Sequence, residues 1–257
     1  MECFVHADKK YFPDYNWFEK AISYPYKAPT ISFTFKNGKF YRGIHISLKD
    51  RVPILSIGSN RSPYQLKNKF GAKENLCVTP AKLYNSVIVY AASMSAYGSI
   101  PATQWPCEGS VTDLNLLWLN QDQLQIMHLT EGLGIAYHYV ELDKNTVGLQ
   151  EDDYSGPIFG YISTRGGYLF EDILPFRLNN IKSNTNTFSS INEHEALNKL
   201  FLEHPIGQNS LESWLKKMIS NKNTRLSLID KMSQKSLIPK NVPWKVIDVK
   251  ITGNNIY

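Results

Sequence analysis

The segment ILSIGSNRSPYQLKNKFG, residues 54–71, constrains the fold most, because it changes from a strand pattern to a helix pattern within one short stretch. The apolar run 54–57 predicts a buried strand. Gly58-Ser59-Asn60 predicts a tight turn, and Ser62 as N-cap predicts a helix over Pro63–Phe70. Such a turn aims several backbone N–H groups at one point, and the helix N-terminus adds positive potential. The segment therefore predicts either a purely structural turn or a small site for a carboxylate, a phosphate or an oxyanion, since no Walker loop or dinucleotide fingerprint is present.

Composition narrows the class of protein. Of the 257 residues, 42% are hydrophobic and 20% are charged, which is typical of a soluble globular chain. No apolar stretch has the length of a membrane span, and the N-terminus has early charges and no apolar h-region, so no secretory signal is expected. The net charge of +5 is mild and spread along the chain, which favours a solvated basic surface over nucleic-acid binding.

The cysteines and histidines show no ligand pattern. The three cysteines, Cys3, Cys77 and Cys107, lie far apart and form no C-x-x-C pair. This spacing argues against a disulfide framework or a zinc ribbon and favours a reducing, cytoplasmic environment. The six histidines are scattered. We therefore expect no metal or organic cofactor, no membrane and no nucleic-acid partner, and the oligomeric state stays open.

The chain divides into three parts by pattern. Residues 1–50 are an aromatic-rich N-terminal extension, in which alternation around Asn37-Gly38 predicts a β-hairpin with a type I′ turn. Residues 51–182 form a strand-rich core. A polar, non-periodic linker over 182–190 leads to a helical C-terminal extension, residues 190–257, which is expected to pack on the core.

Periodicity predicts the main elements of the core and of the C-terminal extension. The predicted core strands are Val52–Ile57, Ser86–Ala92, Val111–Leu119, Tyr137–Leu142 and Ile158–Ser163. The predicted core helices are Pro63–Phe70 and Gln121–Thr130. In the C-terminal extension, Ser190 and Glu193 predict a capping box ahead of the first helix. A last strand is expected within residues 242–251.

A second informative segment, residues 116–132, runs from a strand into a short helix. Asn120 starts the helix Gln121–Thr130 with a capping-box pattern, and Gly132 ends it. Glu131 then lies beside the partial negative charge of the last carbonyl groups. In apolar surroundings a carboxyl group at this place exchanges protons near neutrality, whereas at a frayed helix end it is simply exposed.

The order of these motifs carries a resemblance to a known family. A Gly-Ser-Asn turn after a strand, a central strand, the helix end Glu131-Gly132 and the strand YHYVEL follow one another over residues 52–165. This order resembles the γ-glutamylcyclotransferase-like family, whose members have a Tyr-Gly-Ser-Asn loop, a Leu-Asp-x-x-Glu-Gly helix end and a following Tyr-containing strand. The resemblance covers under half of the chain. It implies an α+β fold, a small closed or nearly closed mixed β-barrel with flanking helices.

The resemblance also implies a reaction and a site. The implied reaction is a lyase-type cyclisation, in which the α-amine of a γ-glutamyl amine or amino acid attacks its own γ-carbonyl and releases 5-oxoproline. Glu131 matches the general acid/base of that reaction. Ile57, Gly58, Ser59 and Asn60 match the substrate-binding loop, whose N–H groups would hold the α-carboxylate or the developing oxyanion.

Two more positions complete the predicted site. Tyr137 and Tyr139 lie on one face of a predicted strand and either could hydrogen-bond the substrate, and Tyr139 is included in the predicted site. Arg165 could bind a substrate carboxylate with two hydrogen bonds, or it is a surface turn residue. The expected partner is a small γ-glutamyl or related amide, and the reaction needs no cofactor.

Two departures from the family pattern keep alternatives open. Ile57 replaces the Tyr before Gly-Ser-Asn, and Met127-His128 replaces the Leu-Asp pair. A catalytically inactive binding module with the same fold and a hydrolase of a small amide are therefore the alternatives to a lyase. His128 is expected to cap the helix C-terminus or to tune Glu131, and Cys107 is expected to be a partly buried thiol and not a nucleophile.

Overall fold

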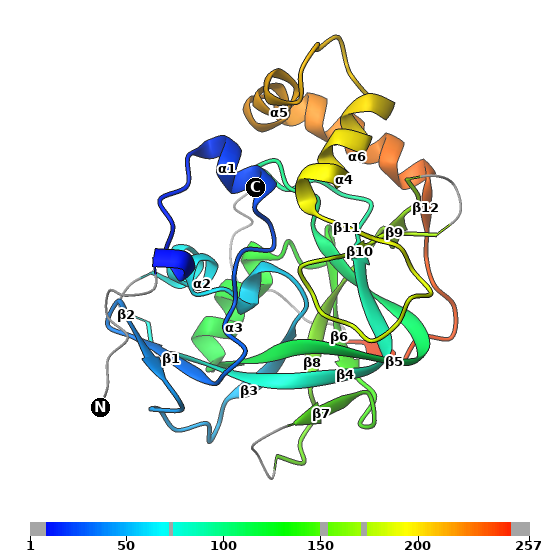
Figure 1. Ribbon diagram of the computed structural model, residues 1–257. Helices are drawn as coiled ribbons and strands as arrows, with labels where there is room; N and C mark the ends of the chain where they lie inside the picture. Colours follow the sequence, from blue (N-terminus) through cyan, green and yellow to red (C-terminus); the bar gives the residue numbers. More distant parts are fainter. Residues whose placement is uncertain (1–8, 72–73, 150–153, 171–173, 248–257) are drawn as a thin grey trace.

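The computed structural model describes residues 9–71, 74–149, 154–170 and 174–247. These residues form a mixed α+β fold in which helices flank one large sheet (Figure 1). The helices are α1 (Trp17–Ile22), α2 (Pro63–Phe70), α3 (Gln121–Thr130), α4 (Glu193–Glu203), α5 (Leu211–Ser220) and α6 (Lys222–Gln234), with 3-10 turns η1 (Lys9–Tyr11) and η2 (Ser59–Arg61). Among these described residues, no helix is long and apolar enough to cross a bilayer.

The large sheet mixes parallel and antiparallel pairs. The strands are β1 (Phe33–Lys36), β2 (Lys39–Arg42), β3 (Val52–Ser56), β4 (Leu76–Tyr90), β5 (Ala102–Leu119), β6 (Tyr137–Leu142), β7 (Val147–Leu149), β8 (Phe159–Ser163), β9 (Gly167–Tyr168), β10 (Arg177–Leu178), β11 (Ser190–Ile191), β12 (Ser236–Leu237) and β13 (Trp244–Val246). Their order is β11-β10-β4-β5-β3-β8-β6-β13, with β1 and β7 also paired to β4 and β2 paired to β1, while β9 and β12 pair separately. The pairings of the described strands include none that joins the two ends of this order, so the closed barrel stays a prediction.

The long hairpin β4–β5 forms the centre of the sheet and exceeds the prediction. Both strands begin earlier in the structure than the predicted strands do. Pro80 and Pro106 lie in the added parts, and a proline in a sequence pattern argues against a strand. The pairing register shifts after Tyr84. Asn85 lies in this bulge with φ of 54°, and its side chain accepts a hydrogen bond from the Gly109 N–H at 2.9 Å. A bulge of this kind bends the strand in which it lies, here β4.

The N-terminal hairpin is confirmed. β1 and β2 pair around Asn37 and Gly38, whose φ angles are 51° and 71°, as a type I′ turn requires. β1 also pairs with β4, from Phe33 opposite Val78. The N-terminal extension therefore continues the core sheet.

The strand–turn–helix segment is also confirmed. β3 leads into η2, and α2 begins at Pro63 after Ser62 and ends at Gly71, whose φ is 82°. Ser62 occupies the N-cap position with an extended backbone, yet its side chain makes no capping hydrogen bond. The short turn η2 thus connects the sheet to α2 directly.

The other helix starts follow capping boxes. Asn120 caps α3 as predicted, with its side chain accepting from the Gln123 N–H at 2.9 Å. The capping box predicted for α4 is wrong in position, because Asn192 and Glu195 form it. Ser190 lies instead in β11, where the irregular segment that follows β10 ends.

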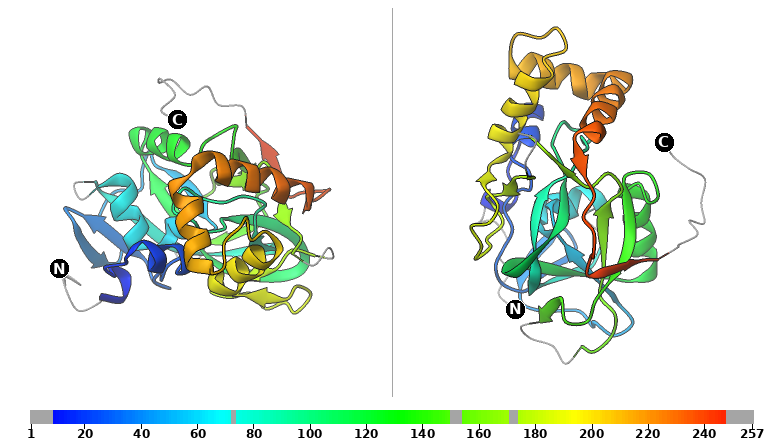
Figure 2. Two further views of the ribbon diagram at one scale, coloured as in Figure 1. Left: turned by 90° about the horizontal axis from the view of Figure 1, so that it is seen from above. Right: turned by 90° about the vertical axis from the view of Figure 1, so that its right-hand side faces the viewer.

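The helices of the C-terminal extension gather at one end of the sheet (Figure 2). Their buried residues Leu200, Trp214 and Met218 belong to one apolar cluster with Leu55 and Trp118 of the sheet. The N-terminal helix α1 packs against α4 and α5. The last strand, β13, pairs antiparallel with β6, and the end of the predicted strand, residues 248–251, lies outside the described residues.

The two cysteines that the structure describes, Cys77 and Cys107, are buried, and Cys107 is a free thiol. Cys3 lies outside the described residues. Cys107 packs in a small apolar cluster with Trp105 and Phe188, so the burial expected for this thiol is confirmed.

Glu193 joins α4 to the core through a buried hydrogen bond. Its Oε1 accepts from the Ile100 N–H at 2.6 Å, and the residue is 1% exposed. Burial raises the pKa of Glu193 well above its ordinary value, and the hydrogen bond from Ile100 opposes this shift. The fold therefore favours the protonated carboxyl group.

We expect Glu193→Gln to be more stable than the wild type near neutral pH. The unfolded carboxyl loses its proton near pH 4.3, so the wild-type free energy of unfolding falls by up to about 1.4 kcal/mol per pH unit above that value until the raised folded pKa is reached. Glutamine keeps the acceptor for Ile100 and does not ionise. Denaturant unfolding at about pH 5 and pH 8 measures the difference, with Glu212→Gln on the exposed face of α5 as the control. Equal pH slopes for wild type and Glu193→Gln would contradict it.

Candidate functional site

A cavity of about 540 Å³ lies beside η2 and the end of α3. Its lining combines the core with both extensions, since α1 and α6 contribute side chains as well as the sheet. Its polar lining residues include Tyr24, Ser59, Asn60, Lys69, Tyr97, Glu131, Tyr137, Arg165, Lys222 and Arg225. The cavity therefore brings together residues that are more than 200 positions apart in the sequence.

Gly58 is the first residue of the loop that follows β3, and the neighbouring atoms leave no room for a side chain at this position. A Cβ atom at this position would lie 2.2 Å from the Tyr24 hydroxyl oxygen and 3.5 Å from the Ala102 Cβ. The Tyr24 hydroxyl oxygen in turn accepts a hydrogen bond from the Ala102 N–H at 3.0 Å. Glycine therefore allows the backbone of the predicted loop to lie against the N-terminal extension while Ser59 and Asn60 face the cavity.

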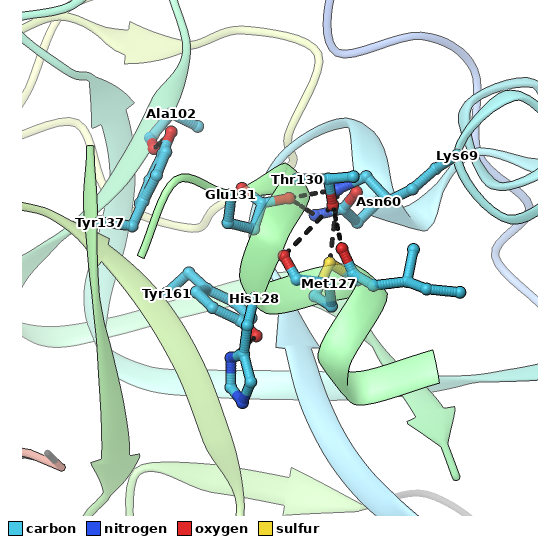
Figure 3. Close-up of polar contacts among 10 residues, drawn as sticks. Asn60, Lys69, Ala102, Met127, His128, Thr130, Glu131, Tyr137 and Tyr161 are labelled. Atoms are coloured by element: carbon cyan, nitrogen blue, oxygen red, sulfur yellow. Dashed lines mark hydrogen bonds and ion pairs between the residues drawn. The ribbon is translucent and has the colours of Figure 1, made fainter. Parts of the chain in front are cut away.

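Glu131 directly follows α3, and its side chain points toward Asn60 in the loop after β3 (Figure 3). The Asn60 side-chain amide donates to Glu131 Oε1 at 2.9 Å. The Lys69 ammonium of α2 forms an ion pair with the same oxygen. The side chains of Lys69 and Glu131 are 6% and 13% exposed, so this is a largely buried ion pair. The two motifs predicted separately from the sequence are therefore in direct contact.

The two carboxylate oxygens of Glu131 differ in their hydrogen-bond partners. Both described donors, Asn60 and Lys69, bind Oε1, and no described residue donates to Oε2. Asn60 and Lys69 give the carboxyl group polar and cationic partners, so it lies neither in purely apolar surroundings nor exposed at a frayed helix end. Oε2 therefore keeps acceptor capacity that no hydrogen bond from the described residues uses.

Tyrosine hydroxyl groups surround this carboxyl group. Burial raises the pKa of Tyr97, and the negative charge of Glu131 adds to the effect, while a hydrogen bond with Ser59 opposes it. Burial, with Glu131 and Tyr97, likewise raises the pKa of Tyr137, whose hydroxyl donates to the Ala102 carbonyl at 3.1 Å. These hydroxyl groups stay protonated and act as neutral hydrogen-bonding groups.

Tyr139 does not reach the cavity, which corrects its place in the predicted site. It is 5% exposed, and its ring stacks on Phe159 at 5.1 Å and meets the His128 ring edge-on at 4.8 Å. Tyr137 and Tyr139 share a strand face, but α3 covers that face at Tyr139 and leaves Tyr137 at the cavity. The tyrosine that lines the site is therefore Tyr137.

His128 lies beneath the site and does not cap α3. Its Nδ1 is 2.7 Å from the Tyr161 hydroxyl, and the residue is 1% exposed. Burial lowers the pKa of His128 below its ordinary value. The His128–Tyr161 pair therefore supports the floor of the cavity, where Tyr161 is also part of the lining.

The rest of the charged lining is cationic. Glu131 is the one carboxylate among the described lining residues, and the cations are Lys20, Lys69, Arg165, Lys222 and Arg225. Arg165 donates one hydrogen bond to the Ile135 carbonyl at 3.2 Å, and Arg225 donates to the Met218 carbonyl at 2.6 Å. A guanidinium has five N–H donors, so each keeps donors for an anionic ligand.

Sequence patterns missed several of these residues. Lys69 has a weak signal, a cation in the last turn of the helix that follows the Gly-Ser-Asn turn. Tyr97 lies in a segment between strands and carries no motif. Lys222 and Arg225 belong to α6, whose approach to the cavity depends on tertiary packing that a sequence pattern does not contain.

Comparisons with known proteins give two weak structural likenesses. No protein-family model and no curated protein matches the chain. A solved structure of a γ-glutamyl cyclotransferase is 17% identical with a TM-score of 0.38, over 44% of this chain and 67% of that chain. A crystal structure of an uncharacterized protein from Homo sapiens is 17% identical with a TM-score of 0.37, over 45% of this chain and 68% of that chain. At these TM-scores neither likeness supports a functional assignment for this chain.

A double-mutant cycle tests the buried ion pair. We expect Lys69→Met to lower the free energy of unfolding by about 3 kcal/mol, because it leaves a largely buried carboxylate without its cation. We expect the double variant Lys69→Met/Glu131→Gln to recover part of this loss, because no unpaired charge remains. Urea unfolding of the wild type, both single variants and the double variant gives the coupling free energy. Additive losses would contradict direct pairing of the two charges.

Proposed function

We propose that the protein is a cyclotransferase-type lyase with a γ-glutamylcyclotransferase-like fold, which converts a γ-glutamyl compound into 5-oxoproline and an amine. The observation that carries the proposal is the contact between Glu131 and the Gly58–Asn60 loop at one cavity, with Oε2 left for the substrate. The sequence resemblance supports it, because it links the same two motifs to this chemistry.

The proposed general acid/base is Glu131. Its Oε2 accepts a proton from the substrate α-ammonium, which frees the lone pair that attacks the γ-carbonyl carbon and closes a five-membered ring. The carbon–nitrogen bond to the leaving group then breaks as the carboxyl group returns the proton to the leaving nitrogen. The ring nitrogen still has one extra proton after the attack, and Glu131 takes this second proton and passes it to the released amine. Over one turnover two protons therefore pass from the α-nitrogen to the leaving nitrogen, and Glu131 ends as the carboxylate from which it began.

The loop and the cations would hold the substrate in the reactive shape. The N–H groups of Gly58, Ser59 and Asn60 are the proposed donors to the α-carboxylate or to the oxyanion that develops on the γ-carbonyl. Arg165 supplies a cation for a substrate carboxylate. Folding a flexible γ-glutamyl chain so that its amine meets its own carbonyl is a large part of such catalysis.

Lys69 has a positioning role in this proposal. Its ion pair and the Asn60 hydrogen bond fix Oε1, so the carboxyl group presents Oε2 in one orientation. The same ion pair is the specific observation that favours a second candidate, a binding module without turnover, because Lys69 already neutralises the carboxylate.

Product analysis separates the candidates. We expect wild-type protein to release 5-oxoproline from at least one member of a panel of γ-glutamyl amines and amino acids. We expect Glu131→Gln to lower kcat about 100- to 10,000-fold, because the general acid/base is lost, whereas Glu212→Gln on α5 keeps the wild-type rate. Chromatography of the products is the measurement.

Other outcomes would overturn parts of the proposal. Linear glutamate as product would indicate the hydrolase. Binding of the panel without any product would indicate the binding module. An unchanged rate in a folded Glu131→Gln variant would rule out Glu131 as the acid/base.

The cations of α6 predict the class of leaving group. Lys222 and Arg225 line the same cavity as Glu131, so we expect γ-glutamyl amino acids, whose leaving group has a carboxylate, to be preferred over neutral γ-glutamyl amines. Lys222→Glu is expected to raise KM for the amino-acid substrates about fivefold and to leave KM for the amines near wild type. Steady-state kinetics with both substrate classes measures this, with Lys216→Glu on α5 as the control. An equal change for both classes would contradict the assignment.

A further inference from the structure

A second cavity of about 540 Å³ borders the same turn η2 at Arg61. Its lining comes from the N-terminal extension, from η2 and from the segment after β10, and the residues are Lys10, Tyr11, Tyr15, Ser23, Pro25, Tyr26, Lys27, Ala28, Arg61 and Asn180. Among these described residues the charged groups are Lys10, Lys27 and Arg61, and none is a carboxylate. The cavity is therefore cationic and rich in tyrosine.

Arg61 is the unusual residue of this cavity. It is 8% exposed, and its described hydrogen bond is a long one, from Nη1 to the Asp113 carbonyl at 3.3 Å. Its Nε is buried without a partner among the described residues. Buried arginines are ordinarily paired with a carboxylate, but the Asp113 carboxylate forms an ion pair with Lys82. The guanidinium thus borders a cavity, and most of its donors have no partner in the part of the chain that the structure describes.

The charge of Arg61 persists despite burial. Burial lowers the pKa of Arg61 to about 10, and the charge of Asp113 opposes the shift. The side chain is therefore a buried cation at neutral pH. Such a cation needs an acceptor, and the cavity next to it is the place from which one can come.

Aromatic rings form another part of this cavity. The rings of Tyr15 and Tyr26 are 5.8 Å apart, and the Lys10 ammonium lies 4.8 Å from the centre of the Tyr11 ring. Tyr26 is 6% exposed and Lys27 beside it is exposed. The lining thus offers flat apolar faces next to cationic groups.

We propose that this second cavity binds a small organic anion, a phosphate or carboxylate group on an aromatic or apolar body, with Arg61 as its principal ligand and Lys27 at the rim. The charged group accepts hydrogen bonds from the guanidinium, and the body of the ligand packs against the tyrosine rings. A volume of about 540 Å³ suits a ligand of this size.

The position of Arg61 also links this site to the first cavity. Asn60 faces Glu131, and the next residue, Arg61, borders the second cavity, and both belong to the three-residue turn η2. A ligand that holds Arg61 therefore holds the turn that carries Asn60. The proposal itself is independent of the reaction at Glu131, because it rests on the second cavity alone.

Calorimetric titration with phenyl phosphate, benzoate and phenol tests the site. We expect phenyl phosphate or benzoate to bind at least tenfold more tightly than phenol, because phenol lacks the charge. Whichever of phenyl phosphate and benzoate binds more tightly identifies the phosphate or the carboxylate as the preferred group. Arg61→Gln and Lys27→Glu are each expected to weaken binding about tenfold or more.

Matched variants keep the test decisive. Arg165→Gln changes the first cavity alone and is expected to leave this binding at the wild-type level. Lys27 is exposed, so Lys27→Glu decides the question if Arg61→Gln fails to fold, as judged by circular dichroism. Absence of binding to the wild type, equal binding of phenol, or a loss with Arg165→Gln and none with Lys27→Glu would each overturn the proposal.

Discussion

The contact of Glu131 with Asn60 and Lys69 is the interaction on which the site depends. It joins the end of α3, the turn η2 and the last turn of α2 at one carboxylate oxygen. A largely buried ion pair forms only where its geometry and hydrogen bonds offset the loss of water. Here the cation and the amide come from a segment that the β3–η2–α2 connection places rigidly beside the sheet. The orientation of the proposed acid/base is therefore a direct consequence of the strand–turn–helix segment.

Both extensions take part in the cavity that this carboxyl group faces. Tyr24 of the N-terminal extension packs against Gly58, and α6 of the C-terminal extension adds Lys222 and Arg225. The residue before Gly58 is Ile57, and the tyrosines that line the cavity are Tyr24, Tyr97, Tyr137 and Tyr161. Tyr24, Lys222 and Arg225 thus bring polar groups to the cavity from outside residues 52–165.

Local patterns predicted the local structure of the site well. The turn after β3, the bounds of α2 and α3, and the hairpin at Asn37-Gly38 all follow from capping, glycine and alternation rules that act over a few residues. The same rules placed Glu131 at the helix end. Order along the chain and the resemblance were then enough to expect Glu131 and Asn60 in one site.

Features that depend on tertiary packing could not be predicted in this way. Tyr137 and Tyr139 are equivalent in a two-residue period, and α3 decides which one is covered. Lys69 reaches Glu131 because α2 packs against α3. The full length of β4 and β5 could not be predicted, because Pro80 and Pro106 argue against a strand in a sequence pattern although the bent hairpin tolerates them. The second cavity beside Arg61 has no sequence signature, since its lining is assembled from three separate segments.

The most direct test of the central claim is a crystal structure of the wild-type protein with 5-oxoproline bound. We expect the product in the cavity beside η2, with its ring nitrogen within hydrogen-bond distance of Glu131 Oε2. Its carboxylate or lactam oxygen would then accept from the N–H groups of the Gly58–Asn60 loop, and the Lys69 contact to Oε1 would be kept. Product bound with Glu131 turned away from it, or bound outside this cavity, would contradict the account.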